Sequence, residues 1–394
     1  MGSDGQPMKI LFLAWNFPPA RGGIEYVAWH LVSGLKACGD EVRVIARHDP
    51  NGVGDPAVAR PSRPGLVAYL LFALRRSRAL LRDFRADVIV CPGIVTAPVA
   101  WWVAKRHGTP VVVLAHGSDV THGGCVYRAA MRFFFRAAAG VAANSRSTKD
   151  LMAAAGCRPA LLRVIHPGVN TADYPPLDPA RREAIRAAHG LAGRKVLFSV
   201  GRLIRRKGVL DFVEQAMPGL VKAVPEVVLV VVGGDATDSL VHHEGMLAQI
   251  QRQVAQRGLE KHVRLLGSVE DATVQELHYA ADIHLLPALQ MKNDVEGFGI
   301  VLLEAALAQV PVVATRVGGI PEALAEGETG LLAEPGDWAG LARQIQALLG
   351  DDALRQRLGR QGRARALAQF GWATIVDQYR AFFRDVQASR GAKP

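Results

Sequence analysis

The chain has 394 residues, of which 49% are hydrophobic and 21% are charged, and its formal net charge is +11. One hydrophobic core rarely serves so long a chain, so we expect two domains, and the composition excludes a disordered protein. Residues 1–175 hold 21 Lys and Arg against 11 Asp and Glu, so the positive charge belongs to the N-terminal half. This surplus favours an anionic partner there.

The sequence predicts a cytoplasmic protein. Its longest apolar runs, at 66–74 and 227–232, fall short of the roughly 20 residues that cross a bilayer, so no membrane span is expected. The first seven residues lack the charged-then-apolar order of a secretory signal. Neither disulfides nor a Cys-ligated metal is indicated, because the cysteines stand singly without metal-type spacing, and no cofactor is expected. They are Cys38, Cys91, Cys125 and Cys157.

Short β-branched runs alternate with longer helical patterns along the first half, which is typical of a parallel sheet covered by helices. We predict strands at 9–14, 41–46, 87–90, 111–115, 140–144 and 162–166. The next segment, 167–179, is rich in proline and turn formers, and we interpret it as the connection and hinge between the domains.

The second half repeats the alternation, which predicts strands at 195–201, 227–233, 262–267, 282–287 and 311–315. The pattern at 372–386 predicts an amphipathic helix that packs back onto the first domain. The fold class is therefore α/β, with two Rossmann-like domains over 1–170 and 171–371 and a C-terminal helix over 372–390. Ligands bind beyond the C-terminal ends of such strands, so we expect the chemistry in a central cleft that both domains face.

Two loops of the first domain follow strands and carry candidate residues. Gly22 and Gly23 come just before a helix, where backbone N–H groups bind anions, although a tight turn without a ligand is an equal alternative. The absence of the fingerprint GxGxxG from this loop disfavours an NAD enzyme. After the fourth strand, His116 and Asp119 stand three residues apart. According to its protonation, His116 can donate to an oxygen or stabilise positive charge that develops nearby, but a satisfied structural histidine is the commoner case.

The first strand of the second domain ends in VGRLIRRKGV. Arg202 directly follows the strand-ending Gly201 and would converge with Lys207 on one phosphate group. For Arg205, Arg206 or Lys207 taken singly, a solvated basic turn is the alternative.

The segment EGFGIVLLE places Glu296 and Glu304 around a glycine-rich turn. A continuous helix would separate them by about 12 Å along its axis. Because Gly297 and Gly299 disfavour a helix in the first half, we expect Glu296 in a loop and Glu304 within a helix. The two carboxylates would then flank a helix N-terminus whose N–H groups hold phosphate.

This segment resembles the E-x7-E motif of the retaining GT-B glycosyltransferases of family 4. The resemblance covers nearly the whole chain, since further motifs follow in the family's order, with PGVN in place of the commoner PNGVD. They are the glycines at 22–23, HGSD at 116–119, NS at 144–145, PGVN at 167–170, GRLIRRKG at 201–208, GGIPE at 318–322 and ETGLL at 328–332. FPPARGGIE and NDVEGFGIVLLEA are most similar to the phosphatidylinositol mannosyltransferase-like branch, which uses GDP-mannose.

The resemblance implies that the first domain binds the acceptor and the second binds the nucleotide-sugar donor. It implies a hexosyltransferase that retains the anomeric configuration and needs no metal ion. Arg202 and Lys207 would neutralise the leaving diphosphate, and Glu304 would bind the ribose. The implied catalytic residues are His116, Asp119, Arg202, Lys207 and Glu296, the last on the transferred sugar. The implied donor-binding residues are Gly22, Gly23, Gly201, Phe298, Gly299, Ile300, Val301 and Glu304.

The basic N-terminal half would meet the acceptor, which we predict to be a lipid or lipid-linked glycan on an anionic membrane surface. Residues 66–85 combine a basic and an apolar stripe, as in helices that lie on membranes. Solvated arginines over core residues are the alternative. The basic stripe contains Arg75, Arg78, Arg82 and Arg85, and the apolar stripe Leu70, Leu74, Leu81 and Phe84; a second basic line contains Arg128, Arg132 and Arg136.

These features predict a peripheral protein on the inner face of the cell membrane. No nucleic-acid partner is expected, because recognisable nucleic-acid motifs are lacking. Three alternatives stay open: a UDP-sugar donor such as UDP-N-acetylglucosamine or UDP-glucose, a UDP-sugar 2-epimerase-like enzyme, and a catalytically idle nucleotide-binding or membrane-docking module.

Overall fold

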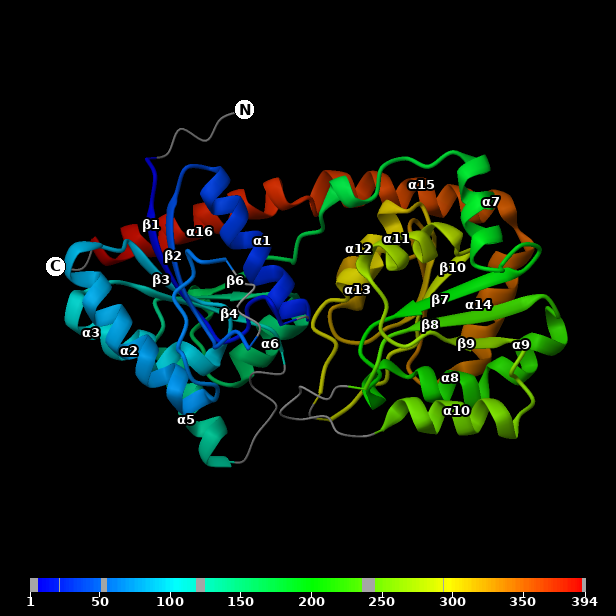
Figure 1. The fold of residues 1–394 in the computed structure, drawn as a ribbon, viewed down its shortest axis with the longest axis horizontal. Helices are drawn as coiled ribbons and strands as arrows, with labels where there is room; N and C mark the ends of the chain where they lie inside the picture. The colour runs from blue at the N-terminus through cyan, green and yellow to red at the C-terminus, as the bar shows by residue number, and fades with distance from the viewer. Residues whose placement is uncertain are drawn as a thin grey trace. The chain divides into compact units, whose positions relative to one another are not determined.

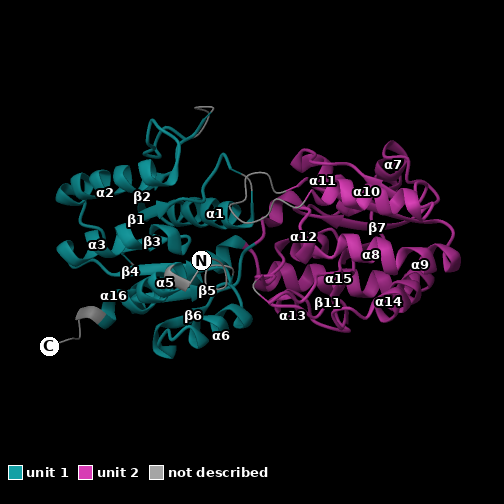
Figure 2. Cartoon of the chain, turned by 90° about the horizontal axis from the view of Figure 1, so that it is seen from below, with its two compact units in different colours: residues 1–168, 372–394 teal, residues 169–371 magenta. Residues whose placement is uncertain are grey.

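The structure, a computed structural model, describes residues 6–20, 22–50, 55–117, 125–235, 245–292 and 294–391. The chain folds into two compact units (Figures 1 and 2). Unit 1 contains residues 1–168 and 372–394, and unit 2 contains residues 169–371.

Unit 1 is built on a six-stranded parallel sheet in the order β2-β1-β3-β4-β5-β6. The strands are β1 (Lys9–Ala14), β2 (Glu41–Ala46), β3 (Val88–Cys91), β4 (Val111–Ala115), β5 (Gly140–Ala143) and β6 (Leu162–Val164). In this order the topological switch point lies between β1 and β3, because the connections leave these strands in opposite directions.

Helices cover both faces of this sheet (Figure 1). Consecutive side chains of a strand point to opposite faces, and accordingly Phe12 and Leu13 of β1 belong to two different core clusters. The Leu13 face packs against α2 (Leu66–Asp83), α3 (Ala97–His107) and α5 (Cys125–Ala137). The Phe12 face packs against α1 (Gly23–Ala37) and α16 (Trp372–Gly391). Unit 1 is completed by α6 (Arg146–Ala154), η1 (Ile94–Thr96) and η2 (Pro159–Leu161).

Unit 2 has a second six-stranded parallel sheet, in the order β12-β11-β10-β7-β8-β9. The strands are β7 (Lys195–Val200), β8 (Val227–Val232), β9 (Val263–Leu265), β10 (Ile283–Leu286), β11 (Val312–Thr315) and β12 (Gly330–Ala333). This is the dinucleotide-fold order, in which the strand sequence reverses between the first and the fourth strand of the unit. A ligand is therefore expected beyond the ends of β7 and β10.

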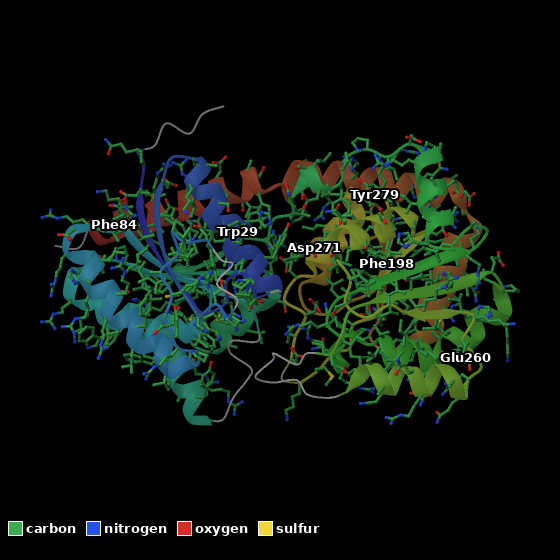
Figure 3. The ribbon with its side chains drawn as sticks, viewed as in Figure 1. Trp29, Phe84, Phe198, Glu260, Asp271 and Tyr279 are labelled. Carbon is green, nitrogen blue, oxygen red and sulfur yellow. The ribbon has the colours of Figure 1, made fainter. Side chains whose placement is uncertain are left out.

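The unit 2 sheet is also covered on both faces. Phe198 of β7 (Figure 3) faces one cluster and its neighbour Leu197 the other. The Phe198 face packs against α11 (Asp271–Ala280), α12 (Ile300–Leu307), α13 (Ile320–Ala323) and α15 (Asp352–Gln369). The Leu197 face packs against α8 (Val209–Gln215), α9 (Met217–Ala223), α10 (Met246–Gln256) and α14 (Trp338–Gly350). The remaining elements are α7 (Pro179–Ala188), η3 (Thr171–Asp173) and η4 (Arg205–Lys207).

The prediction of two parallel α/β sheets is confirmed, and each predicted strand forms with ends that agree within two residues. One edge strand, β12, was not predicted, because its sequence GLLA is short and begins with glycine, a residue that is uncommon in strands. The C-terminal helix extends beyond the pattern at 372–386 and ends one residue after the predicted 372–390. None of the helices that the structure describes has the length and apolar character of a membrane span.

Candidate active site

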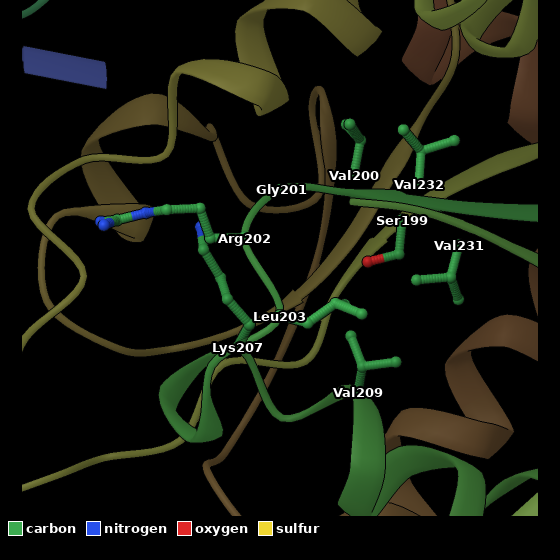
Figure 4. A pocket seen from close by; sticks show the side chains of 9 residues that line it. All are labelled: Ser199, Val200, Gly201, Arg202, Leu203, Lys207, Val209, Val231 and Val232. Carbon is green, nitrogen blue, oxygen red and sulfur yellow. The ribbon is translucent and has the colours of Figure 1, made fainter. Parts of the chain in front are cut away.

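The loop after β7 carries the cationic part of the candidate site. Gly201 directly follows the strand, and η4 begins three residues after Arg202. Gly201, Arg202 and Lys207 line a small pocket together with residues of β7 and β8. In Figure 4 the side chains of Arg202 and Lys207 extend to the same side beyond the end of β7. The structure therefore brings together the two cations that were predicted to meet a phosphate group.

Lys207 pairs with a carboxylate of the neighbouring loop. Its Nζ lies 2.9 Å from Oε2 of Glu296, which follows β10. Burial lowers the pKa of Lys207, the charge of Glu296 opposes this effect, and Arg206 adds to it. The ammonium group is therefore held in place by Glu296 beside the pocket that it shares with Arg202.

Arg206 is buried, so the alternative of a solvated basic turn is wrong for this residue. Its side chain is only 9% exposed, hydrogen-bonds to Glu296, and places Nε 2.9 Å from Oδ1 of Asp294. The alternative of a solvated turn is wrong for Lys207 too, whose side chain is 16% exposed. Sequence reasoning missed Arg206 because three consecutive basic residues give no sign of which one turns inward; the acidic residues of NDVE were the only hint of a partner.

Glu296 lies in a loop and Glu304 lies within α12, as predicted. Burial alone would favour a protonated Glu296, but the charges of Arg206 and Lys207 lower its pKa to about 2. The carboxylate is thus ionised at neutral pH. An ionised carboxylate with fixed neighbours is a strong hydrogen-bond acceptor for hydroxyl groups.

Between the two glutamates, α12 begins at Ile300, directly after Gly299. Gly299 has φ 88°, a left-handed conformation that glycine adopts readily. The N–H groups of Ile300 and Val301 are in the first turn, where helical N–H groups have no partner within the helix. This helix end can therefore receive an anion.

Glu304 is partly buried on α12, and its environment differs from that of Glu296. Burial and the nearby carboxylates of Asp173 and Asp271 raise its pKa to about 7. Asp271, labelled in Figure 3, begins α11. Two carboxylates of one motif therefore have pKa values on opposite sides of the ordinary range, since one has cationic neighbours and the other acidic ones.

The ring of Phe298, a predicted donor-binding residue, lies in the core and is not exposed to a ligand. Its side chain is 2% exposed and packs against Phe370, with 5.8 Å between the ring centroids. The ring belongs to the core under α12. Phe298 therefore anchors the turn between Glu296 and α12.

The two glycines of GGIPE pack against the backbone of the same turn. Gly319 N donates a hydrogen bond of 3.0 Å to Glu296 O. A Cβ at Gly318 would lie 2.1 Å from Glu296 O, and one at Gly319 would lie 2.2 Å from Gly297 O. Only glycine allows this close approach of two backbones, so this motif positions Glu296 through main-chain contact.

In unit 1, Gly22 and Gly23 stand at the start of α1, and His116 follows β4. The carboxylate of Glu25 lies beside Gly22, because a Cβ at Gly22 would be 2.5 Å from Glu25 Oε2. His116 Nε2 lies 2.8 Å from Pro92 O, to which it donates a hydrogen bond, so its ring is oriented by the loop after β3. Asp119, predicted to be catalytic, lies outside the described residues.

Within the described parts of the chain, no three His, Cys, Asp or Glu side chains gather as metal ligands would.

Comparisons with known proteins agree with this geometry. A family model described as "Glycosyl transferases group 1" matches residues 181–365, and one described as "Glycosyltransferase Family 4" matches residues 21–173. A GDP-mannose-dependent alpha-(1-6)-phosphatidylinositol monomannoside mannosyltransferase of Mycolicibacterium smegmatis is 29% identical over 93% of this chain and 95% of its own length. A glycogen synthase of Mycobacterium tuberculosis is 28% identical over 94% of this chain and 92% of its own.

The crystal structure of HepE from Anabaena in complex with UDP aligns with a TM-score of 0.80 and 22% identity, over 96% of this chain and all of that chain. The two sheets and this likeness define the GT-B fold of glycosyltransferases. With its two halves matched by glycosyltransferase models, the chain belongs to glycosyltransferase family 4.

Proposed function

We propose that the chain is a retaining hexosyltransferase that moves mannose from GDP-mannose to a membrane-associated lipid or lipid-linked glycan. The observation that carries this proposal is that Arg202 and Lys207 line one pocket at the switch point of unit 2, and that Lys207 pairs with Glu296 on the loop that leads into α12. Cations and free N–H groups in one place suit a nucleoside diphosphate. The choice of GDP-mannose rests on the mannosyltransferase among the relatives.

In this proposal unit 2, residues 169–371, is the donor-binding domain, for which the predicted bounds were 171–371. Arg202 and Lys207 bind the diphosphate with the N–H groups of Gly201, Gly299, Ile300 and Val301. Glu304 accepts hydrogen bonds from the ribose hydroxyls, and Glu296 accepts them from the transferred sugar. Phe298 contributes through its backbone, since its ring belongs to the core.

Unit 1, residues 1–168 and 372–394, is the proposed acceptor-binding domain, for which the predicted bounds were 1–170 with the C-terminal helix. We assign Gly22 and Gly23 to the donor phosphates and His116 and Asp119 to the sugar near the reaction centre. The hydrogen bond to Pro92 fixes the orientation of the His116 ring. A residue that contacts a reacting sugar requires such a fixed orientation.

The reaction breaks the bond between the anomeric carbon and the diphosphate oxygen. Positive charge develops on the sugar and negative charge on the diphosphate. Arg202 and Lys207 line the same pocket before the reaction, so their positive charges already stand beside the departing diphosphate and stabilise it. We propose that they do so without a divalent ion, and that the acceptor hydroxyl attacks from the leaving-group face, which retains the configuration.

A donor panel tests this function. GDP-mannose, UDP-glucose and UDP-N-acetylglucosamine are each incubated with the protein, a lipid extract and a chelator, and nucleoside diphosphate release is measured. We expect GDP release from GDP-mannose that depends on the lipid extract. Release of UDP alone would favour the UDP-sugar alternative, which the likeness to HepE bound to UDP makes worth testing.

Two further outcomes would overturn the proposal. Conversion of a UDP-sugar without acceptor would indicate the 2-epimerase-like enzyme, and no turnover with any donor would indicate an idle binding module. Activity that disappears with the chelator and returns with a divalent cation would contradict the metal-independent mechanism. The anomeric configuration of the product, read by NMR, tests retention.

The proposed membrane contact is the outer surface of α2 and α3. Arg75, Arg78, Arg82 and Arg85 are exposed there, as a basic membrane-binding stripe requires. The guanidinium of Arg78 lies 4.7 Å from the ring centroid of Trp102 on α3, and that of Arg106 lies 5.8 Å from it. Trp102 is 37% exposed. Tryptophan flanked by cations is typical of the membrane interface.

The apolar stripe of the predicted amphipathic helix faces the core of unit 1, so the proposed contact uses only the basic side of α2. Leu81 and Phe84 are buried, and Leu70 and Leu74 pack against the core of unit 1. The exposed apolar residues near the arginines are instead Val67, Leu71 and Trp102. In the second basic line Arg136 donates to Gly156 O at 3.0 Å, so it has a structural role as well.

We propose on this basis a peripheral protein on the inner face of the cell membrane, where nucleotide sugars and lipid acceptors meet. The charge of the first half and its exposed arginines support this location.

A further inference from the structure

Four charged side chains of unit 2 form a compact cluster between the ends of β7 and β10. Oε2 of Glu296 interacts with both Lys207 and Arg206, and Arg206 also pairs with Asp294. None of the four exposes more than 16% of its side chain. The cluster thus joins the proposed diphosphate-binding lysine to the proposed sugar-binding glutamate.

Two cations and two carboxylates balance within this cluster. A donor diphosphate adds negative charge beside Lys207, and Lys207 turns toward it at the expense of Glu296. A buried carboxylate that loses its partner is strongly destabilised, so Glu296 needs a second cation. Arg206 is that cation, and arginine keeps its charge even when buried, whereas a buried lysine can lose its proton.

The backbone of the turn is fixed independently of this side chain. Leu289 N, in the loop after β10, donates a hydrogen bond of 2.8 Å to Arg206 O. The two loops therefore stay joined through the main chain when the guanidinium is removed. A substitution at Arg206 tests the charge more than the path of the chain.

We propose that Arg206, held by Asp294, is a positioning residue that keeps Glu296 ionised and in place and so releases Lys207 to the donor diphosphate. This inference rests on the proposed donor site. It assigns to the middle residue of the basic turn a role that is separate from contact with the donor.

Other charged groups reach the same cluster. Arg202, on the loop after β7, lowers the pKa of Lys207, and Lys207 in turn lowers that of His284 on β10, whose pKa is already lowered by burial. His284 is neutral across the useful pH range, so it contributes no titration. Glu304 titrates in wild type and variants alike, so the ratio of the variant's kcat to the wild-type kcat reports the titration of Glu296 alone.

The test compares Arg206→Gln and Arg206→Lys with the matched control Arg205→Gln. Arg205 is on the same turn, and its Nη2 lies 2.8 Å from Asp211 Oδ1. The measured quantities are kcat and donor KM for GDP-mannose over about pH 5–8, the Kd values of GDP and UDP by calorimetry, and the melting temperature. The pH range lies above the ordinary carboxyl pKa of about 4.3 and covers the values to which burial raises the pKa of a carboxyl group that has lost a cation.

We expect Arg206→Gln to lower kcat roughly 10- to 100-fold, the range typical of residues that orient a ligand-contacting group. The ratio of its kcat to that of wild type falls further toward acidic pH, because Glu296 loses the cation that keeps it ionised. Arg206→Lys retains the charge and recovers the wild-type shape of the profile, although not the full kcat, since lysine cannot bridge both carboxylates. Arg205→Gln behaves as wild type.

A lower melting temperature and lower kcat with an unchanged profile would indicate a merely structural residue and overturn the proposal. If Arg206→Gln does not fold, the test rests on Arg206→Lys. A wild-type kcat of Arg206→Lys at every pH would show that the bridge to Asp294 is irrelevant and would overturn the proposal.

Binding separates this inference from the proposed function. If wild type binds GDP or UDP but turns over no donor, the transferase proposal fails alone. Arg206→Gln should then bind the nucleotide several-fold more weakly at neutral pH and recover at acidic pH, where protonated Glu296 releases Lys207; a constant ratio would overturn the inference. If wild type binds neither nucleotide, the donor site and this inference fail together.

Discussion

The arginines of α2 in unit 1 and those of the buried charge clusters in unit 2 have opposite surroundings. In unit 1, Arg75 and Arg78 of α2 are exposed, and Arg78 lies over the ring of Trp102. In unit 2, Arg206 is buried among carboxylates, and Arg186, only 6% exposed, places Nη1 3.2 Å from Oδ1 of Asp282. One sheet architecture therefore supports a charged outer surface in one unit and a buried charge cluster in the other.

This difference matters because the two kinds of cation act over different distances. Exposed cations attract an extended anionic surface, and salt screens them within about 10 Å. Buried cations act on one group at short range, and they require partners to be stable. We therefore expect substitutions of the buried charges in unit 2 to change stability and turnover, and substitutions of the exposed arginines of α2 to change membrane binding.

Glu296→Gln should have the largest effect. It leaves Arg206 and Lys207 without their shared carboxylate and should lower the free energy of unfolding by about 3–5 kcal/mol at neutral pH. Because the folded-state pKa is depressed, from 4.5 to about 2, this stabilisation is present above pH 4.5 and is lost as pH falls through about 2. Urea unfolding between pH 8 and pH 3 checks this, with the exposed Glu260→Gln as control.

An equal stability of Glu296→Gln and Glu260→Gln at pH 7 would contradict the buried cluster. A difference that grows as the pH falls would contradict the sign of the pKa shift.

Lys207→Ala should remove one fixed charge from the leaving diphosphate. The expected cost is about 3 kcal/mol in the barrier, or roughly a hundredfold in kcat. Steady-state release of nucleoside diphosphate measures this effect. Lys222→Ala, an exposed lysine on α9, is the matched control and should retain wild-type activity. Less than a tenfold loss for Lys207→Ala would argue against its role at the diphosphate.

Replacement of the four exposed arginines of α2 and its C-terminal flank by serine should weaken binding to anionic vesicles by at least tenfold. Each cation near such a surface contributes up to about 1 kcal/mol. Flotation with phosphatidylglycerol-containing vesicles at low and high salt measures it. The variant carries Arg75→Ser, Arg78→Ser, Arg82→Ser and Arg85→Ser, and the control carries Arg252→Ser, Arg343→Ser, Arg357→Ser and Arg360→Ser, all exposed in unit 2.

Donor turnover in detergent should stay unchanged in both variants. Equal vesicle binding by the two would remove the assignment of the membrane contact to α2.

Glu304→Gln should have the smallest and most pH-dependent effect. The folded-state pKa is raised from 4.5 to about 7, so the protonated form stabilises the fold below pH 4.5 and this advantage is lost as pH rises through 7. Glutamine resembles the protonated carboxyl, so the variant should melt higher than wild type at pH 8 and close to it at pH 5. The pH dependence of the melting temperature between these values should decrease.

Nucleotide binding gives an independent reading of the same group. Wild-type affinity for the nucleoside diphosphate should increase several-fold from pH 6 to pH 8, because an ionised carboxylate accepts ribose hydroxyls more strongly. The affinity of Glu304→Gln should vary less. An identical pH dependence in both proteins would exclude Glu304 from the ribose site.

Several features were accessible from local patterns. Alternation of short β-branched runs with helical patterns predicted the two sheets, and β12 escaped because so short a run has little pattern. Gly297 and Gly299 were sufficient to place Glu296 in a loop and Glu304 on a helix, since glycine disfavours helix locally. The ordered motifs predicted the family.

The orientation of individual side chains was not accessible in this way. The basic turn offered three candidates, and only the packing of the β10 loop against it directs Arg206 inward to Asp294 and Glu296. On α2 the same amphipathic pattern fits a core or a membrane, and only the sheet beneath it shows that Leu81 and Phe84 face the core.

The amino-acid order alone therefore determined the element types, their sequence and the family, because strand, helix and turn preferences act over a few neighbouring residues. The tertiary structure alone decided which charges are buried together and how far two glutamates of one motif differ in pKa. Those properties depend on groups distant in the chain, because desolvation and Coulomb interaction depend on distance in space.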